Sequence, residues 1–123
     1  MASQSLDITL KLSSDSNING ILTLNTTEND TLTFDDSEVI AKTVTAAAGA
    51  QTEIVPTSAA DTYVYIKNTD VTNFLQVQTV ANHNYAKIFP GEFIFICIDN
   101  PVGMEVVANT GDIVVEYVTF KKG

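Results

Sequence analysis

The fold is decided by residues 61–98, which read DTYVYIKNTDVTNFLQVQTVANHNYAKIFPGEFIFICI. Short runs of β-branched and aromatic residues recur here about every ten residues, a spacing typical of a β-sandwich or barrel. Polar turns separate the runs, and Pro90-Gly91 offers the fixed φ and the positive φ of a type II turn. The stretch predicts four strands: Tyr63–Lys67, Phe74–Thr79, Tyr85–Phe89 and Phe93–Ile98.

The same spacing continues on both sides of this stretch. Downstream, turns at residues 100–103 and 109–112 separate two further predicted strands, Met104–Ala108 and Ile113–Phe120. Upstream, Gln51–Val55 is a short strand that Pro56 ends. Glu38–Ala48 is ambiguous, because Val39, Ile40 and Val44 suit a strand while the three alanines before Gly49 suit a helical turn.

The N-terminal segment alternates apolar and polar residues. This alternation predicts a strand with one solvent-exposed face and one buried face. The apolar residues are Leu6, Ile8, Leu10 and Leu12, and the polar residues between them are Asp7, Thr9 and Lys11. Leu22 and Leu24, and then Leu32 and Phe34, repeat the pattern on either side of a predicted polar loop, Asn25–Asp30.

The composition agrees with a β-rich fold in one domain. The chain has 123 residues, 45% of them hydrophobic, and it contains sixteen threonines, thirteen valines and eleven isoleucines. β-Branched residues pack well on a pleated surface. We therefore predict an all-β, antiparallel β-sandwich, jelly-roll-like, with nine or ten strands and no long helix, in a single domain spanning 1–123.

The run Phe93–Ile98 is apolar on both faces. An exposed edge strand of this composition would pair with other chains, so the run is predicted to be a central strand. Cys97 is the only cysteine and lies within the run, so it is expected to be an inert core residue with no disulfide partner in the chain.

The charge balance excludes one class of partner. Fifteen acidic residues against six lysines, with no arginine, give a net charge of −9, which opposes binding to nucleic acid. The N-terminus does not resemble a signal peptide, and the longest apolar run is shorter than the roughly 20 residues of a membrane-spanning helix. We expect no membrane partner and a soluble, cytoplasmic product.

No constellation of residues indicates catalysis, a cofactor or a metal. His83 is the only histidine and lies in a predicted loop, so a solvated loop residue is favoured over a general base. The acids Asp35, Asp36 and Glu38, with Glu28 and Asp30 upstream, do not match the spacing of an EF-hand loop. The isolated glycines form no phosphate-binding loop. We therefore predict no catalytic, cofactor-binding or metal-binding residue.

Four segments resemble a pattern that recurs in small virion proteins of tailed bacteriophages. They are Tyr63–Thr69, Asn73–Val77, Ile88–Phe93 and Val114–Tyr117, within about residues 60 to 120. The resemblance implies a jelly-roll or β-sandwich subunit that oligomerises and sits on the capsid exterior, or in a neck or tail part, and it transfers no catalytic residue. Low charge density also suits contacts in which edge strands add to a neighbouring sheet.

From this resemblance we expect a capsid decoration, or cement, protein. It would be made in the host cytoplasm and bind the major capsid protein on the outside of the virion, as a homotrimer. The polar residues Met1, Ala2, Ser3, Gln4 and Ser5 have no role in the predicted sandwich, so we expect them to take part in anchoring.

Two other classes of function stay open at this point. A receptor- or carbohydrate-binding module would use Tyr63, Tyr65, Phe74 or loop acids with Ca²⁺. An enzyme of the cupin type would need clustered histidine and glutamate ligands, which the sequence lacks.

Overall fold

The computed structural model describes residues 3–13, 25–35, 40–57, 61–99 and 102–121. Ten strands and no helix are found in this part of the chain, which confirms the predicted all-β class. The strands are β1 (Ser3–Ser13), β2 (Asn25–Asp35), β3 (Ile40–Ala46), β4 (Thr52–Val55), β5 (Thr62–Asn68), β6 (Leu75–Gln78), β7 (Asn84–Ile88), β8 (Phe93–Ile98), β9 (Met104–Ala108) and β10 (Ile113–Lys121).

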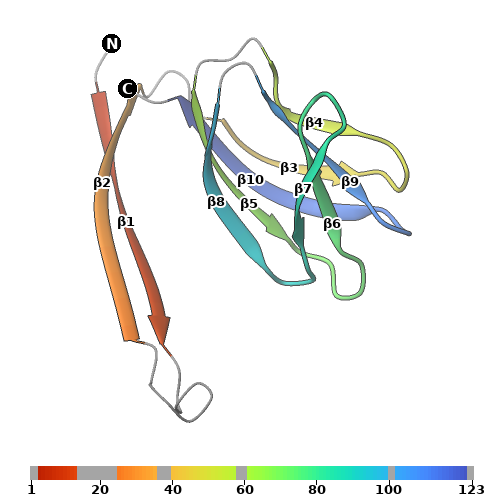
Figure 1. Ribbon diagram of the computed structural model, residues 1–123, viewed down its shortest axis with the longest axis horizontal. Coiled ribbons are helices and arrows are strands. Elements are labelled where there is room, and N and C mark those ends of the chain that lie inside the picture. The colour runs from red at the N-terminus through yellow and green to blue at the C-terminus, as the bar shows by residue number, and fades with distance from the viewer. Residues whose placement is uncertain (1–2, 14–24, 36–39, 58–60, 100–101, 122–123) are drawn as a thin grey trace.

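Eight of these strands form two packed antiparallel sheets (Figure 1). The strand orders are β3-β10-β5-β8 and β4-β9-β6-β7. The sandwich can be described as one long antiparallel two-stranded ribbon that is wound up. The paired strands of this ribbon are β3 with β10, β4 with β9, β5 with β8 and β6 with β7. Two further pairs, β5 with β10 and β6 with β9, join successive parts of the wound ribbon into the two sheets. This order is that of the jelly roll, as predicted.

The core lies between the sheets, and side-chain alternation places its residues along β5 and most of β10. Along β5, Val64 and Ile66 are fully buried, while Tyr63, Tyr65 and Lys67 between and beside them point to the outer face. β10 alternates in the same way. The buried apolar side chains of the core are Ala46, Ile54, Val55, Val64, Ile66, Leu75, Val77, Ile88, Ile98, Met104, Val106, Ala108, Ile113, Val115 and Tyr117.

A buried asparagine ties together one end of the sandwich. The Asn68 side chain is fully buried at the end of β5, and its Nδ2 donates to the carbonyl oxygens of Asn73 and Ile88, each at 2.9 Å. Its Oδ1 accepts from the Asp70 N–H at 2.8 Å. The Asp70 carboxylate accepts from the N–H groups of Asn73 and Thr72, which lower its pKa. One amide thus supplies partners to three backbone groups, two in the β5–β6 loop and one at the end of β7.

Turn geometry agrees with the predicted glycine positions. Glu92 N–H donates to the Phe89 carbonyl at 2.9 Å across Pro90-Gly91, and Gly91 has φ of 78°, as the type II turn requires. At Gly103, φ is 70°, and a Cβ there would lie 2.6 Å from Val80 Cγ2 and 2.8 Å from the Val55 carbonyl oxygen. Only glycine fits this second position without displacing its neighbours.

The first two strands form a separate two-stranded hairpin. β1 and β2 pair antiparallel over eleven residues, from Ser3 opposite Asp35 to Ser13 opposite Asn25. The hairpin stands beside the sandwich and diverges from it toward the end of β1 (Figure 1). Leu10 and Leu12 are 48% and 46% exposed, so the predicted buried face of the first strand is wrong for the single chain. The reason is that no second layer of described residues covers this part of the hairpin.

Three other details differ from the sequence-based expectations. The predicted loop Asn25–Asp30 is strand, because its residues pair in continuous register with residues 8–13. The predicted strand around Leu22 and Leu24 lies outside the described residues. The ambiguous segment 38–48 contains β3, which pairs along β10.

The most informative correction concerns Phe93–Ile98. This run is β8, which pairs only with β5 in the described part of the chain and is the edge of its sheet. The winding of the ribbon fixes this position, because the strand that pairs with β5 on the other side is β10. Phe93, Phe95, Ile96 and Cys97 are exposed. The predictions of a central strand and of a buried Cys97 are therefore wrong.

Asn68→Ala should destabilise the protein strongly. The substitution leaves the Asn73 and Ile88 carbonyls without their side-chain donor in a buried site, where each lost partner costs about 1–3 kcal/mol. We expect the free energy of unfolding, measured by urea denaturation, to fall by about 3 kcal/mol. Asn109→Ala, which removes one exposed side-chain contact, is the control and should change it by less than about 0.5 kcal/mol. Equal effects would contradict the structural role of Asn68.

Gly103→Ala and Gly49→Ala form a matched pair at positive φ. Gly49 has φ of 72°, but a Cβ there meets nothing within 4 Å, so its replacement costs only the backbone strain of about 1 kcal/mol. Gly103→Ala adds the clash with Val80 and Val55, for a total of about 3 kcal/mol. Thermal unfolding of both variants should show a clearly lower Tm for Gly103→Ala, and similar Tm values would show that the contact at Gly103 is relaxed at little cost.

Candidate functional site

The outer face of the sheet β3-β10-β5-β8 carries a band of aromatic side chains. Three cross-strand rows run over β10, β5 and β8. The rows are Phe120, Tyr63 and Cys97; Val118, Tyr65 and Phe95; and Glu116, Lys67 and Phe93. Because odd positions of β5 and β8 face outward, alternation brings these residues together on one surface.

The rings of this face stack on one another. The Tyr63 ring centroid lies 5.9 Å from that of Phe95 and 5.4 Å from that of Phe120, with nearly parallel planes in the first case. Tyr65 lies 5.9 Å from Phe93 in a tilted arrangement. Such pairs are favourable beyond the area they bury. The rings therefore form an ordered apolar platform, which we call the aromatic face.

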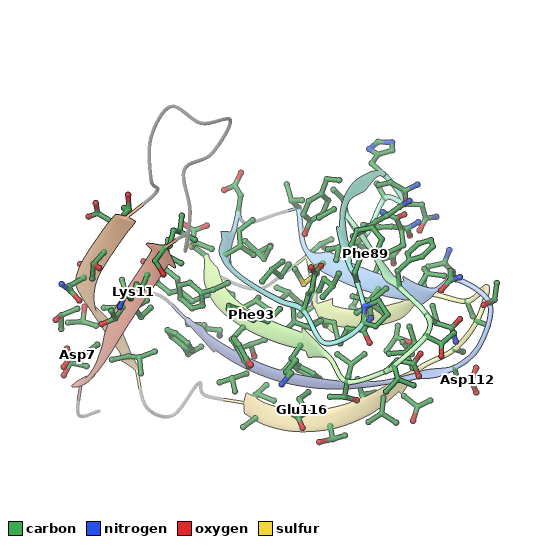
Figure 2. The ribbon with its side chains drawn as sticks, turned by 90° about the horizontal axis from the view of Figure 1, so that it is seen from below. Asp7, Lys11, Phe89, Phe93, Asp112 and Glu116 are labelled. Carbon is green, nitrogen blue, oxygen red and sulfur yellow. The ribbon has the colours of Figure 1, made fainter. Side chains whose placement is uncertain are left out.

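The exposure of the phenylalanines of the aromatic face rises from the first row to the third. Phe120 is only 3% exposed, Phe95 is 38% exposed and Phe93 is 59% exposed. Phe93 lies on the side of the sandwich nearest the hairpin, whereas Phe89 lies well away from it (Figure 2). An exposed phenylalanine on an edge strand is unusual in a monomeric protein, where edge strands carry charges or proline. This gradient shows where the face is left open.

The hairpin has two different faces. On one, the Thr9 hydroxyl donates to Asn29 Oδ1 at 2.9 Å and the Thr31 hydroxyl donates to Asp7 Oδ1 at 2.8 Å. On the other, Leu6 lies directly opposite Leu32, and Ile8, Leu10 and Leu12 of β1 lie opposite Asp30, Glu28 and Thr26 of β2. We call this second side the leucine face. Its residues contribute little to a core of their own, since a lone hairpin has no second layer.

A groove separates the hairpin from the aromatic face. One part, of about 390 Å³, is lined by Leu6, Asp7 and Ile8 of β1 and by Tyr65, Phe93, Phe95, Val118 and Phe120 of the sandwich. A second part, of about 680 Å³, lies between residues 8–11 of β1 and residues 93–95 of β8. The exposed surface of both parts is mainly apolar, with Asp7, Thr9 and Lys11 as its polar members, so the groove is better suited to an apolar protein segment than to a charged small molecule.

The outer face of the other sheet carries a row of polar side chains. Glu53, Glu105, Gln78 and Asn84 lie directly opposite one another across β4, β9, β6 and β7. Glu105 is 6% exposed, and its Oε1 and Gln78 Oε1 have no hydrogen-bond partner among the described residues. Burial raises the pKa of the Glu105 carboxyl, and the Glu53 carboxylate opposite raises it further. Because Gln78 is the cross-strand partner of Glu105, reversing the amides of Gln78 and Asn84 would turn the Gln78 N–H groups toward that carboxyl.

The residues considered for other chemistry are not brought together. No group of three or more histidine, cysteine or acidic residues capable of holding a metal occurs among the described residues. His83 is exposed in the loop between β6 and β7. Glu28 and Asp30 lie on β2, while Asp36 and Glu38 lie outside the described residues. Phe74 packs against Phe89, with Lys87 Nζ 4.5 Å from its ring centre.

The expected anchoring residues fall at the start of the hairpin. Ser3, Gln4 and Ser5 are the first residues of β1, paired with Asp35, Phe34 and Thr33. Met1 and Ala2 lie outside the described residues. The anchoring role of these five residues stays a prediction. What the sequence reasoning missed is the larger surface beside them, for which the doubly apolar run Phe93–Ile98 was the available signal.

Comparison of the chain with protein-family models, with curated proteins and with solved structures found no match. In the described residues there is no helix of the length and apolarity needed to span a membrane.

Glu105→Gln should stabilise the protein at neutral pH and remove one source of pH dependence. With a raised folded-state pKa, the stability that neutral Glu105 contributes is present below the ordinary glutamate pKa of 4.5 and is lost as pH rises through the folded-state value. We expect Glu105→Gln to raise the free energy of unfolding by about 1 kcal/mol at neutral pH and to match the parent protein in acid.

The control for this prediction is Glu53→Gln. It removes the opposing charge from an exposed position and should act in the same direction with a smaller effect. Denaturation curves at several pH values measure both variants. A Glu105→Gln protein that is less stable than the parent at neutral pH would show that the carboxylate is ionised and well solvated.

Proposed function

We propose that this chain is a non-enzymatic structural protein that works by binding other protein surfaces, and more specifically a capsid decoration protein of a tailed phage. The observation that carries the proposal is the apolar surface formed by the aromatic face and the leucine face, which are both exposed and lie across one groove. Large exposed apolar surfaces of this kind mark interaction sites.

The fold is compatible with the specific role but does not define it. Jelly rolls occur in viral capsids, in lectins and in cupin enzymes. The fold therefore limits the possible classes of function but does not select one of them. The phage assignment rests on the resemblance of residues 60 to 120 to small virion proteins. A net charge of −9 also suits the outside of a shell, away from packaged DNA.

The protein would act by reinforcing the shell mechanically. A homotrimer bound to the major capsid protein bridges neighbouring shell subunits and adds interface that exists only in the assembled shell. Because the ligand binds the assembled state alone, it stabilises that state by mass action. Residues Met1–Ser5, of which Ser3–Ser5 begin β1, are proposed to order against the shell.

Carbohydrate binding is the less favoured candidate. A sugar ring stacks on an open aromatic face, but the Tyr63 ring is already stacked with Phe95 and Phe120. Tyr65 is part of the groove wall, where it faces apolar side chains of the hairpin. These contacts favour protein over sugar as the occupant.

Binding to shells tests the proposed function. Full-length protein mixed with shells that lack it should co-sediment with them, saturate, and raise the temperature at which the shells dissociate. Deleting residues 2–5 should weaken binding at least about tenfold, the effect of losing about 1.4 kcal/mol of contact. Deleting residues 122–123 is the matched control at the other terminus and should leave binding unchanged.

Two outcomes would contradict the proposal. A folded protein that does not bind shells at any concentration would overturn the decoration role. Reproducible sugar binding on a glycan array, in the absence of shell binding, would favour the carbohydrate-binding alternative.

A further inference from the structure

The outer face of the sheet β4-β9-β6-β7 brings three side chains with oxygen ligands together. Glu105 of β9 has Glu53 directly opposite on β4 and Gln78 directly opposite on β6. Met104 and Val106, on either side of Glu105, are fully buried in the core. Alternation therefore directs Glu105 to the outer face, and its cross-strand partners share that face with it.

Two oxygen atoms in this group are buried without a hydrogen-bond partner. Glu105 is 6% exposed although it carries a carboxyl group on the outer face, and its Oε1 accepts from no group in the described part of the chain. Gln78 Oε1, on the residue directly opposite, is buried in the same condition. Both atoms are acceptors, so neither can satisfy the other. What this pair lacks is a positive charge or a proton donor.

The sheet supplies no positive charge to this group. Lys87 is the only positively charged residue in its four strands, and it lies opposite Gln76 on β7. Its Nζ is 4.5 Å from the centre of the Phe74 ring. The register instead places a second carboxylate, that of Glu53, directly opposite Glu105, and like charges in this position are destabilising.

We propose that Glu53, Glu105 and Gln78 form a site for a hard divalent cation, with Ca²⁺ as the representative ion. Carboxylate and amide oxygens are the ligands that Ca²⁺ prefers, and water completes its coordination shell. The cation gives both buried oxygens the partner that they lack and neutralises two opposed carboxylates at once. The inference goes beyond the proposed function and does not depend on shell binding.

The site has two carboxylates and one amide oxygen, so it differs from a cluster of three acidic residues. The three ligands come from β4, β9 and β6, which are adjacent in the sheet. A bound ion therefore joins three strands that are separated along the chain. Because the unfolded chain does not hold these ligands together, binding favours the folded state.

Two other arrangements would satisfy the same buried atoms. Reversing the amides of Gln78 and Asn84 turns N–H groups toward Glu105, and a proton on Glu105 would donate to Gln78 Oε1. The first leaves two carboxylates opposed, and the second is lost as pH rises. Neither arrangement predicts that stability responds to Ca²⁺ beyond the response to any salt, so the cation site is separated from both by experiment.

Thermal unfolding of the full chain in CaCl₂ or EDTA tests the site. NaCl is added to the EDTA sample to match ionic strength, since salt alone screens a net charge of −9. A Ca²⁺ site with few charged ligands has a Kd of about 1 mM. We expect about 10 mM CaCl₂ at neutral pH to raise the Tm by about 4 °C.

Three glutamine variants locate the ion. Glu105→Gln and Glu53→Gln each remove a charged ligand and should lose most of the Tm shift. Glu116→Gln is the matched control, because it changes the net charge equally from an exposed position on the other sheet, and it should keep the full shift. In EDTA, Glu105→Gln keeps the raised stability predicted above, so its loss of the Ca²⁺ response is not a loss of folding.

A titration of the ¹⁵N-labelled protein with CaCl₂, followed by NMR, gives a second readout. Backbone amide shifts of β4, β9 and β6 should change together along one saturable curve, and the apparent Kd should rise at least about tenfold in Glu105→Gln. Equal Tm shifts in the parent, Glu105→Gln and Glu116→Gln would mean general charge screening and would overturn the site. A parent protein with no saturable shift would overturn it as well and leave amide reversal or protonation as the explanation of the buried oxygens.

Discussion

The pairing of β5 with both β8 and β10 is the constraint on which the rest of the structure depends. It sets the register in which Val64 and Ile66 point into the core and Tyr63, Tyr65 and Lys67 point out of it. A slip of one residue would exchange these two sets and bury a lysine. The same register stacks Tyr63 on Phe95 and Phe120, so one set of hydrogen bonds specifies both the interior and the aromatic face.

The sheets are closed by different means at their two ends. At one end, a single buried amide, Asn68, satisfies carbonyls that the strands leave without partners. At the other, Gly103 lets the chain turn against Val55 and Val80 where a side chain has no room. Both devices are local, and neither shapes the groove beside the hairpin.

The sequence could predict the strands and turns but not which strands lie next to one another in the sheets. The alternation of Tyr63–Lys67 and the turn at Pro90-Gly91 identify strands and a turn, because local side-chain and backbone preferences determine them. Whether a strand is central or at an edge depends on the winding of the whole ribbon, which is a long-range property. Phe93–Ile98 reads as a buried strand for that reason, although it is the edge. The groove escaped prediction because it needs the placement of the hairpin as well.

The combination of an open leucine face with a net charge of −9 has a consequence for the unassembled chain. Like charges keep separate copies apart over distances of about a Debye length, which is about 10 Å at 0.1 M salt. At shorter separations, attraction between the apolar surfaces of two copies opposes this charge repulsion. Encounters between copies are therefore slower in dilute electrolyte and become more frequent as the ionic strength rises.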